Sequence, residues 1–449
     1  MLPLLLVLLF CVLGVLTGVL TGLLPGLHVN NIALIFLSLS GVIVSIFSFL
    51  FNYGISTEFI LVLICVYIIS VSISHTFHDI IPSTFLGAPD EDMALSVLPA
   101  HSLLLEGKGY EAVALSAIGS YGAILFCFFL IYPFRFILGE PLLFYESLRE
   151  IMLFVLIAVS LLLLATEKAK IEIFGKRGLF SSIVGILFAI IVFFISGIFG
   201  IIVFELPVYS PIGVSAPVLF PALAGLFGTP TLFTSLVTKP KLPKQNFTDI
   251  SFDKKTKKSL FFSVVTGSLG GTLVSVIPGL TSSTGTVIAM IARGKSDKRQ
   301  TIITLSAVNT ACAFCVVVIM FITLRARSGA TLVVRNLVSV VEWTKLLMPT
   351  NLVYFLIAII FGGTLSYFLT LKIGKFFAKH FTRIPYLLLI KLTICMITIL
   401  VFLFTGLIGI IVLVVATFIG LLPVQWGVRR SHCMGVLLVP IILYFIYIP

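Results

Sequence analysis

Two stretches of sequence interrupt long apolar runs in the same way: GLLPGLHVNN at residues 22–31 and SVIPGLTSSTG at residues 275–285. Each has a Pro-Gly-Leu triplet that follows an apolar run and precedes a group of polar residues. Proline has no backbone N–H to donate, and glycine adopts backbone conformations that other residues resist. Each stretch therefore predicts a break in a helix, with polar groups directly after the break.

The residues before the two breaks repeat as well. When Pro25 is aligned with Pro278, Gly26 aligns with Gly279. The small residues that precede the prolines then coincide at helical spacing: Gly14 with Gly267, Gly18 with Gly271, and Gly22 with Ser275. A Pro-Gly match alone arises by chance, but the match together with three spaced small residues predicts an internal repeat.

The composition shows in what kind of protein these breaks lie. Of the 449 residues, 59% are hydrophobic and 10% are charged, whereas a soluble chain has about 25% charged residues. A soluble globular protein is therefore excluded. Apolar runs that are long enough to cross a bilayer predict about ten to twelve membrane segments. The runs are 2–24, 32–51, 58–77, 112–138, 148–165, 179–204, 260–277, 300–324, 350–371, 386–405, 406–423 and 433–448.

The distribution of charge predicts how the two breaks are oriented. The chain has 29 Lys and Arg against 17 Asp and Glu, a net charge of +12. In a membrane protein this excess indicates cytoplasmic loops rather than a nucleic-acid partner. The first Lys or Arg is Lys108, so no positive residue flanks the first break, whereas Lys254–Lys258 and Arg293–Arg299 flank the second. Hairpins that enter the membrane from opposite sides explain this pattern, which is typical of inverted-repeat transporters.

We therefore expect an all-α polytopic protein of the cell membrane, an inverted repeat with two re-entrant or broken-helix hairpins. The first repeat half covers residues 1–238 and has its hairpin tip at 25–31. A basic cytoplasmic linker covers residues 239–258. The second half covers residues 259–449 and has its tip at 278–284.

The two hairpin tips form the predicted binding site. A broken helix is tolerated in hydrocarbon only where protein buries it or water reaches it, and a helix N-terminus offers free N–H donors to an anion. The residues expected to shape the tips are Pro25, Gly26, Pro278 and Gly279. Asn30, Asn31, Ser283 and Thr284 follow the tips and are expected to coordinate a carboxylate, a phosphate or a cation. Alternatively, these polar residues are helix caps and packing contacts with no ligand role.

Charged residues within the apolar sequence are further candidates, because charge inside a membrane is costly. Arg325 and Arg327 lie between apolar runs of the second half, and Asp90, Glu91 and Asp92 are consecutive acids in the first half. Three interpretations stay open for the arginines. They neutralise an anionic substrate, they pair with these acids as a structural bridge, or they mark a loop at the membrane surface.

His75, His78 and Asp79 are candidates for proton transfer, because histidine changes its charge near neutral pH. Histidines that serve only as helix contacts are common, and this alternative stays open. The remaining histidines that lie in or near predicted loops receive no role, namely His101, His380 and His432.

The sequence predicts no metal site and no organic cofactor. Cys312-x-x-Cys315 has neither a second cysteine pair nor a nearby histidine to complete a metal or redox site. The spacing of His75-x-x-His78-Asp79 also differs from the HExxH pattern of zinc proteases.

A set of ordered landmarks resembles the TctA-type permeases, the large membrane subunit of tripartite tricarboxylate transporters, and especially their archaeal stand-alone relatives. The landmarks are GVLTGVLTGLLPGL (14–27), the stretch 86–123 that begins LGAPDEDM, GLFGTPTLF (225–233), the stretch 257–280 that ends SVIPGL, and AVNTA (307–311). The resemblance implies an inverted-repeat transporter whose opposed hairpin tips bind citrate-like carboxylates. It also implies an extracytoplasmic binding protein, a small membrane subunit and an ion gradient as partners in transport.

Two departures from the family pattern bear on the substrate. Pro89-Asp90 stands where the first turn of the family ends in Pro-Gly, and Arg325-Ala326-Arg327-Ser328 stands where the second half repeats such a turn. These charges favour a different anion, such as a phosphate, or a salt-bridged gate. We assign coupling or gating to His75, His78, Asp79, Asp90, Glu91, Asp92 and Asn309, and substrate contacts to the tip residues with Arg325 and Arg327.

The leading hypothesis is a secondary transporter that moves a small di- or tricarboxylate-like anion by alternating access, coupled to H⁺ or Na⁺. One alternative is a translocase of a lipid-linked phosphate such as polyprenyl phosphate, which would contact membrane lipid. Alternatives of other classes are an intramembrane enzyme and a scaffold subunit. The oligomeric state stays open, with a homo-oligomer among the possibilities.

Overall fold

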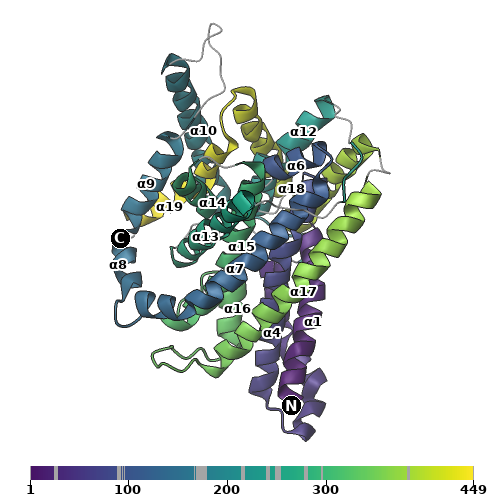
Figure 1. Cartoon of the computed structure of the whole chain (residues 1–449), viewed down its shortest axis with the longest axis vertical. Coiled ribbons are helices and arrows are strands. Elements are labelled where there is room, and N and C mark those ends of the chain that lie inside the picture. Colours follow the sequence, from purple (N-terminus) through teal and green to yellow (C-terminus); the bar gives the residue numbers. More distant parts are fainter. Residues whose placement is uncertain are drawn as a thin grey trace.

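The computed structural model describes residues 2–24, 29–87, 93, 95, 97–165, 167, 179–213, 218–238, 243–247, 254–277, 282–294, 297–381 and 385–447. The Pro-Gly pairs of both tips and the acids Asp90, Glu91 and Asp92 lie outside the described residues, as do the side chains of Asn31 and Ser283. Within these ranges every regular element is a helix, and Figure 1 shows their arrangement.

The helices follow one another with short connections. In chain order they are α1 (Leu2–Leu23), α2 (Val29–Ser38), α3 (Ser40–Ile46), η1 (Phe47–Tyr53), α4 (Thr57–His78), α5 (Ile80–Phe85), α6 (Val97–Leu105), α7 (Gly109–Leu138), α8 (Phe144–Glu150), α9 (Met152–Ala165), α10 (Leu179–Glu205), α11 (Leu219–Leu223), η3 (Ala224–Gly228), α12 (Thr229–Thr238), α13 (Lys254–Val276), α14 (Ser282–Arg293), α15 (Lys298–Thr323), α16 (Gly329–Leu337), α17 (Thr350–Phe381), α18 (Tyr386–Gln425), η4 (Arg430–Met434) and α19 (Gly435–Tyr447).

Ten helices among the described residues are long and apolar enough to cross a membrane. The number rises to 11 if Ile32–Ser38 and Ser40–Tyr53, which meet at an angle of 64°, are counted as one span. This confirms the expectation of an all-α polytopic membrane protein. One span, Leu219–Thr238, is missing from the predicted runs. Buried Thr229, Thr231 and Ser235 explain the omission, because polar residues lower the apolar character of a segment that protein rather than lipid surrounds.

The glycine row of the first hairpin lets α1 lie directly against α4. A Cβ atom on Gly14 would lie 2.5 Å from the Tyr67 carbonyl oxygen, and one on Gly18 would lie 2.5 Å from the Ser74 Cβ. No side chain fits into this space, so the two helices approach as closely as their backbones allow. Close helix approach through small residues is a common form of packing in membranes.

The glycine row of the second hairpin makes the same kind of contact between α13 and α15. A Cβ atom on Gly267 would lie 2.6 Å from the Thr304 carbonyl oxygen, and one on Gly271 would lie 2.3 Å from the Val308 carbonyl oxygen. In both hairpins, therefore, the first helix packs through its glycines on the helix that follows the hairpin.

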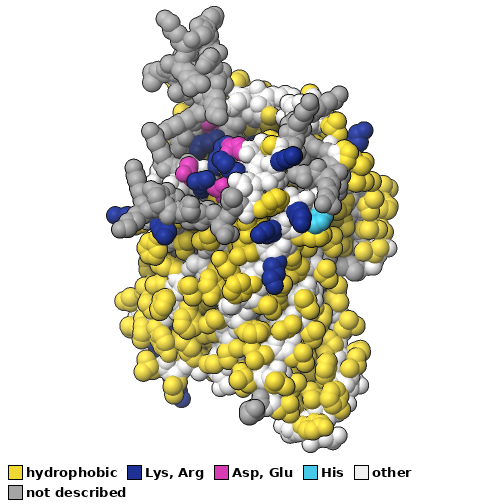
Figure 2. All heavy atoms as spheres, turned by 45° about the vertical axis from the view of Figure 1, so that its right-hand side comes forward, with side chains coloured by type: hydrophobic (Ala, Val, Ile, Leu, Met, Phe, Trp, Pro, Cys, Tyr) yellow, Lys and Arg dark blue, Asp and Glu magenta, His cyan; other side chains and the backbone are white. Residues whose placement is uncertain are grey.

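The flanks of the two hairpins lie at different ends of the protein. Most charged side chains on the face seen in Figure 2 gather at one end above a broad apolar surface; we call this the charged end, marked by Glu106 and Lys298. The second hairpin begins and ends there, because Arg293 at the end of α14 donates to the Ser259 carbonyl oxygen near the start of α13 (2.9 Å). The first hairpin begins and ends at the other end, where the rings of Phe10 and Phe47 lie 5.4 Å apart.

Candidate functional site

One turn of α4, His75–Asp79, is polar on several sides although it lies in the centre of an apolar bundle. His75 Nδ1 lies 3.1 Å from the Thr21 hydroxyl of α1. On another side of the turn, His78 Nε2 lies 3.1 Å from the Thr370 hydroxyl of α17. All of these side chains are buried. The polar turn therefore connects α4 to two neighbouring helices through hydrogen bonds.

The same turn contacts α15, which belongs to the other half of the chain. Asn309 Nδ2 donates to Asp79 Oδ2 over 2.7 Å, and the hydroxyls of Thr76 and Thr310 lie 3.0 Å apart. Asp79 is 1% exposed and Asn309 is 3% exposed, so the hydrogen bond is enclosed by protein. Two of the residues predicted for coupling or gating are thus direct partners.

The local sequence explains why Asp79 lies at an irregular point of its helix. Asp79 separates α4 from α5, which together form the span Thr57–Phe85. Pro82 lacks the N–H that would bond the carbonyl of His78. The Ser83 hydroxyl donates to the next carbonyl oxygen, that of Asp79, over 2.9 Å.

Hydroxyl groups on α7 extend this cluster. The hydroxyls of Ser116 and Ser306 lie 2.7 Å apart, and the Ser120 hydroxyl lies within hydrogen-bonding distance of the Thr76 and Ser306 carbonyl oxygens. We call these contacts, together with those of the polar turn, the polar layer. It joins α1, α4, α7, α15 and α17. An unsatisfied buried polar group costs about 1–3 kcal/mol, so a hydrogen-bonded layer of this kind favours one defined arrangement of the helices.

Arg327 lies in the connection between α15 and α16, close to the first hairpin. Ser328 caps α16, and the backbone N–H of Ala330 donates to Asn30 Oδ1 over 3.0 Å. Asn30 follows the first tip directly, so the structure brings this predicted site residue to the N-terminus of α16. The Arg327 side chain is half-buried, and its Nε has no hydrogen-bond partner among the described residues.

The N-terminus of α16 lies near the level of the polar layer. Ser328 and Ala330 line a narrow pocket together with Ile69 and Ser72 of α4. Ser72 precedes His75 by three residues, about 4.5 Å along the helix axis. Asn30, the start of α16 and the polar layer therefore lie in one region of the protein.

Arg325 shares the neighbour Tyr145 with Arg327 but is more exposed. Its guanidinium lies 3.6 Å from Glu146 Oε1 and 5.4 Å above the ring of Tyr145, both on α8, and the side chain is 43% exposed. Among the described residues Arg325 thus pairs with an acid that the sequence did not suggest as a partner. Thr284 of the second tip is buried on α14.

The profile of the tripartite tricarboxylate transporter TctA family matches residues 8–435, which include both hairpins and every part of the polar layer. The chain belongs to this family. It is also similar to the uncharacterized protein MJ1079 of Methanocaldococcus jannaschii, with 29% identity over 386 residues that cover 85% of this chain and 88% of that protein. No solved structure matches the chain significantly.

Membership of the TctA family shows that the chain is a multi-pass membrane protein of a transporter family. Several residues of the polar layer were not predicted from the sequence. They are Thr21, Thr76, Ser116, Ser120, Ser306, Thr310 and Thr370. A signal was present on α15, where Ser306, Asn309 and Thr310 recur at the spacing of one helix face.

A second buried polar cluster of this TctA-family chain involves a histidine to which no role was given. Glu167 accepts hydrogen bonds from the backbone N–H of Arg429 (3.1 Å) and its Nε (3.2 Å), and it contacts His432 Nε2. Burial raises the pKa of Glu167, but the hydrogen bonds from His432 and Arg429 outweigh this effect, so the pKa lies below its usual value. His432 is therefore a buried partner of a carboxylate and not a loop residue.

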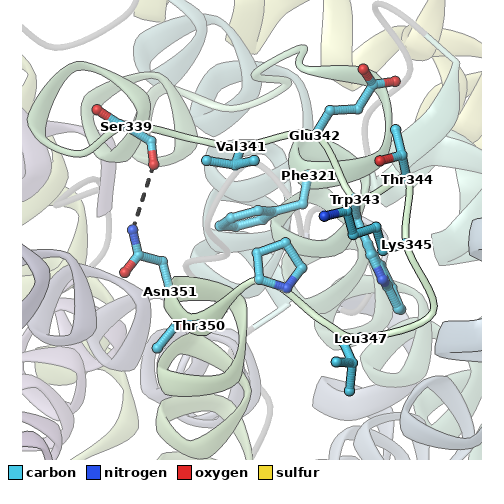
Figure 3. A pocket seen from close by; sticks show the side chains of 11 residues that line it. Phe321, Ser339, Val341, Glu342, Trp343, Thr344, Lys345, Leu347, Thr350 and Asn351 are labelled. Carbon is cyan, nitrogen blue, oxygen red and sulfur yellow. Dashed lines mark hydrogen bonds between the residues drawn. The ribbon is translucent and has the colours of Figure 1, made fainter.

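A surface pocket of about 360 Å³ lies at the end away from the charged end. Figure 3 shows its lining, which comes from the loop before α17 and the start of that helix, including Trp343, Lys345 and Asn351. It holds none of the predicted site residues. Among the described residues, no group of three or more His, Cys, Asp or Glu is placed to hold a metal ion.

Proposed function

We propose that the chain is a secondary transporter that moves a small organic anion of the di- or tricarboxylate class by alternating access. The observation that carries the proposal is the buried hydrogen bond between Asp79 and Asn309, about two helical turns from the point where α4 meets the N-terminus of α16. Polar residues that are buried in membrane helices are costly and mark substrate or ion pathways. Membership of the TctA family supports a carboxylate as the substrate.

We assign recognition of the anion to the region of Arg327 and Asn30. A half-buried guanidinium binds a carboxylate through two parallel hydrogen bonds, and the N-terminus of α16 adds a partial positive charge. Asn30 already accepts a hydrogen bond there from the Ala330 N–H, which a carboxylate oxygen could replace. The substrate would therefore compete with Asn30 for α16, and this competition would link substrate binding to the position of the first tip.

We assign ion coupling to the polar turn. Asp79 can bind a proton or, with the hydroxyls of Thr76 and Thr310, contribute oxygen ligands to Na⁺. His75 and His78 are further proton carriers in the same turn. A change of charge on Asp79 would alter its hydrogen bond with Asn309, and this bond joins helices from the two halves of the chain.

The partners of the family extend the proposal. Two further subunits are expected, a small membrane subunit and an extracytoplasmic binding protein that delivers the anion. Copurification of the chain with its genomic neighbours tests this expectation. The transport assay described next uses the chain alone and, in parallel, the chain with any subunit that copurifies.

Uptake of radiolabelled citrate into proteoliposomes tests the transport function. We expect saturable uptake that requires an imposed H⁺ or Na⁺ gradient and that Arg327→Gln reduces by at least tenfold. Arg335→Gln is the matched control, because Arg335 is exposed on α16, the short helix that follows Arg327, and has no ion pair among the described residues. Uptake that neither gradient drives, or equal uptake by both variants, would contradict the proposal.

A lipid-linked phosphate is the second candidate substrate. The observation that favours it is Arg325, whose half-exposed guanidinium lies beside an aromatic ring on α8 and is accessible for a head group. Flipping of a fluorescent polyprenyl phosphate between leaflets of the same proteoliposomes, without citrate uptake, would support this candidate over the first.

A further inference from the structure

The last quarter of the chain contains eight cations and no acid of its own. After Glu342 the sequence contains no Asp or Glu. The cations in this part are Lys345, Lys372, Lys375, Lys379, Arg383, Lys391, Arg429 and Arg430. Three of them, Lys372, Lys375 and Lys379, lie on the last turns of α17, and all three side chains are exposed.

These lysines differ from Lys298 and Arg299 at the charged end, which have partners in the protein. Lys298 Nζ lies 2.6 Å from Glu106 Oε1, and Arg299 Nε lies 2.5 Å from Glu111 Oε1. Among the described residues, by contrast, no ion pair involves the three lysines of α17. Their charge is available to a partner outside the chain.

The spacing places the three lysines along one face of the helix. Positions separated by three and four residues are neighbours on a helix surface, where like charges repel each other. An anion between them would relieve this repulsion. Phe376, which is 59% exposed, stands among the lysines, and Phe368, 57% exposed, lies two turns earlier on α17.

The position of this face suggests which anion binds. Figure 2 shows Lys and Arg side chains along the border between the charged end and the apolar surface, on the side of the molecule that carries α17. Ammonium groups beside exposed aromatic rings match a membrane surface, where phosphates lie next to acyl chains. A soluble anion would gain nothing from the exposed phenylalanines.

We propose that Lys372, Lys375 and Lys379 bind the phosphate groups of anionic membrane lipids, with Phe376 in contact with the acyl chains of the same lipids. The proposal is independent of the transported substrate, because none of these residues belongs to the polar layer or to the α16 region. Each lysine near an anionic surface contributes about a fivefold gain in affinity. The three together predict a preference of roughly a hundredfold for an anionic over a zwitterionic lipid.

Native mass spectrometry of the full chain in detergent, titrated with phosphatidylglycerol or phosphatidylcholine, tests the proposal. We expect phosphatidylglycerol to bind preferentially. The triple variant Lys372→Gln/Lys375→Gln/Lys379→Gln should lose this preference by at least tenfold, with unchanged binding of phosphatidylcholine. The corresponding triple Lys→Arg variant should retain the preference for phosphatidylglycerol. This result would show that the protein tolerates substitution at these positions.

Two controls identify the location and the source of the phosphate. The double variant Arg335→Gln/Lys345→Gln removes two exposed cations from other parts of the chain and should leave phosphatidylglycerol binding unchanged. Inorganic phosphate at millimolar concentration should not displace the lipid. Equal lipid binding by the triple Gln variant and the double variant, or displacement by inorganic phosphate, would overturn the proposal.

Discussion

The amide of Asn309 donates a hydrogen bond of 2.7 Å to the carboxylate of Asp79 in the interior of the protein. The two residues are separated by 230 positions in the sequence, and each belongs to a helix that follows one of the two hairpins. The contact therefore joins the two halves of the chain at the level of the polar turn. A rearrangement that moves one half against the other has to break or replace it.

Removal of one partner tests the importance of this contact. Asn309→Ala removes the hydrogen bond that the amide donates to the buried Asp79 carboxylate, so we expect a loss of about 1–3 kcal/mol in stability and a strong loss of transport. The thermal transition in detergent and citrate uptake measure the two effects. The exchanged pair Asp79→Asn/Asn309→Asp can form the same bond in the reverse direction and should regain stability. If Asn309→Ala retained wild-type stability and uptake, the bond would have no structural or coupling role.

The glycine rows predict sharp steric limits on the hairpins. Gly271→Ala places a Cβ atom 2.3 Å from the Val308 carbonyl oxygen, so α13 has to move away from α15. Overpacking of this kind costs about 1–3 kcal/mol, and the thermal transition should fall accordingly. Gly41→Ala is the matched control, because nothing lies within 4 Å of a Cβ atom there. The control should leave the transition unchanged or raise it, since alanine favours a helix over glycine. Equal behaviour of the two variants would show that the close approach does not limit the fold.

Much of the architecture could be predicted from local sequence, and the pairing within the site could not. Pro25 and Pro278 indicate the two breaks through the chemistry of proline alone. The contact of Asp79 with Asn309 depends instead on the relative position of two helices, which no local pattern specifies. The hydrogen bond between the hydroxyls of Ser116 and Ser306 was not predicted for the same reason. A serine in an apolar helix is usually interpreted as a small packing residue unless its hydrogen-bond partner is known.

Glu167 and His432 show a second limit of the sequence. His432 follows two arginines and precedes an apolar run, a pattern typical of a surface turn. In the structure the turn folds back onto Glu167, which lies 265 positions earlier, contacts His432 and pairs with Arg429. Whether a charged residue is buried depends on a partner that is distant in the sequence. The residues around it in the sequence therefore cannot predict its burial.

The ion pairs at the charged end predict a dependence on pH and salt. Lys298→Glu brings an acid against Glu106 in place of the 2.6 Å ion pair, and we expect a lower thermal transition at neutral pH. The double variant Glu106→Lys/Lys298→Glu should restore the transition. Because the pair is exposed, added salt at about 0.5 M should reduce the difference by screening.

The sign of the pH effect at this ion pair follows from Glu106. The hydrogen bond from Lys298, helped by Lys108, holds the pKa of Glu106 below its usual value. A depressed carboxyl pKa gives a stabilising contribution that is present above the unfolded value of about 4.3 and is lost as pH falls through the folded value. The difference between the wild type and Lys298→Glu should therefore narrow below about pH 4. If the difference in thermal transition between the wild type and Lys298→Glu grew on acidification, Glu106 would be excluded as the partner of Lys298.

Glu167 provides the last prediction, because its carboxylate is fully buried against Arg429 and His432. Glu167→Gln keeps the size of the side chain but removes the negative charge, which leaves Arg429 without its acid partner. We expect a loss of about 2 kcal/mol in stability, less than for a completely buried pair because Arg429 is half-exposed. Thermal transitions in detergent at pH 7 measure this loss. Glu146→Gln is the matched control, since Glu146 is 56% exposed and lies 3.6 Å from Arg325, and an exposed pair contributes about 0–1 kcal/mol.

Acid titration separates the charge of Glu167 from its packing. Its pKa lies below the usual value, so its contribution is complete above about pH 4.3 and disappears as pH falls through the lowered folded value. The difference in thermal transition between the wild type and Glu167→Gln should stay constant between about pH 6 and pH 8. It should disappear on acidification below about pH 4. A gap that persisted at low pH would assign the loss to packing, because the protonated carboxylic acid and the amide then carry the same charge.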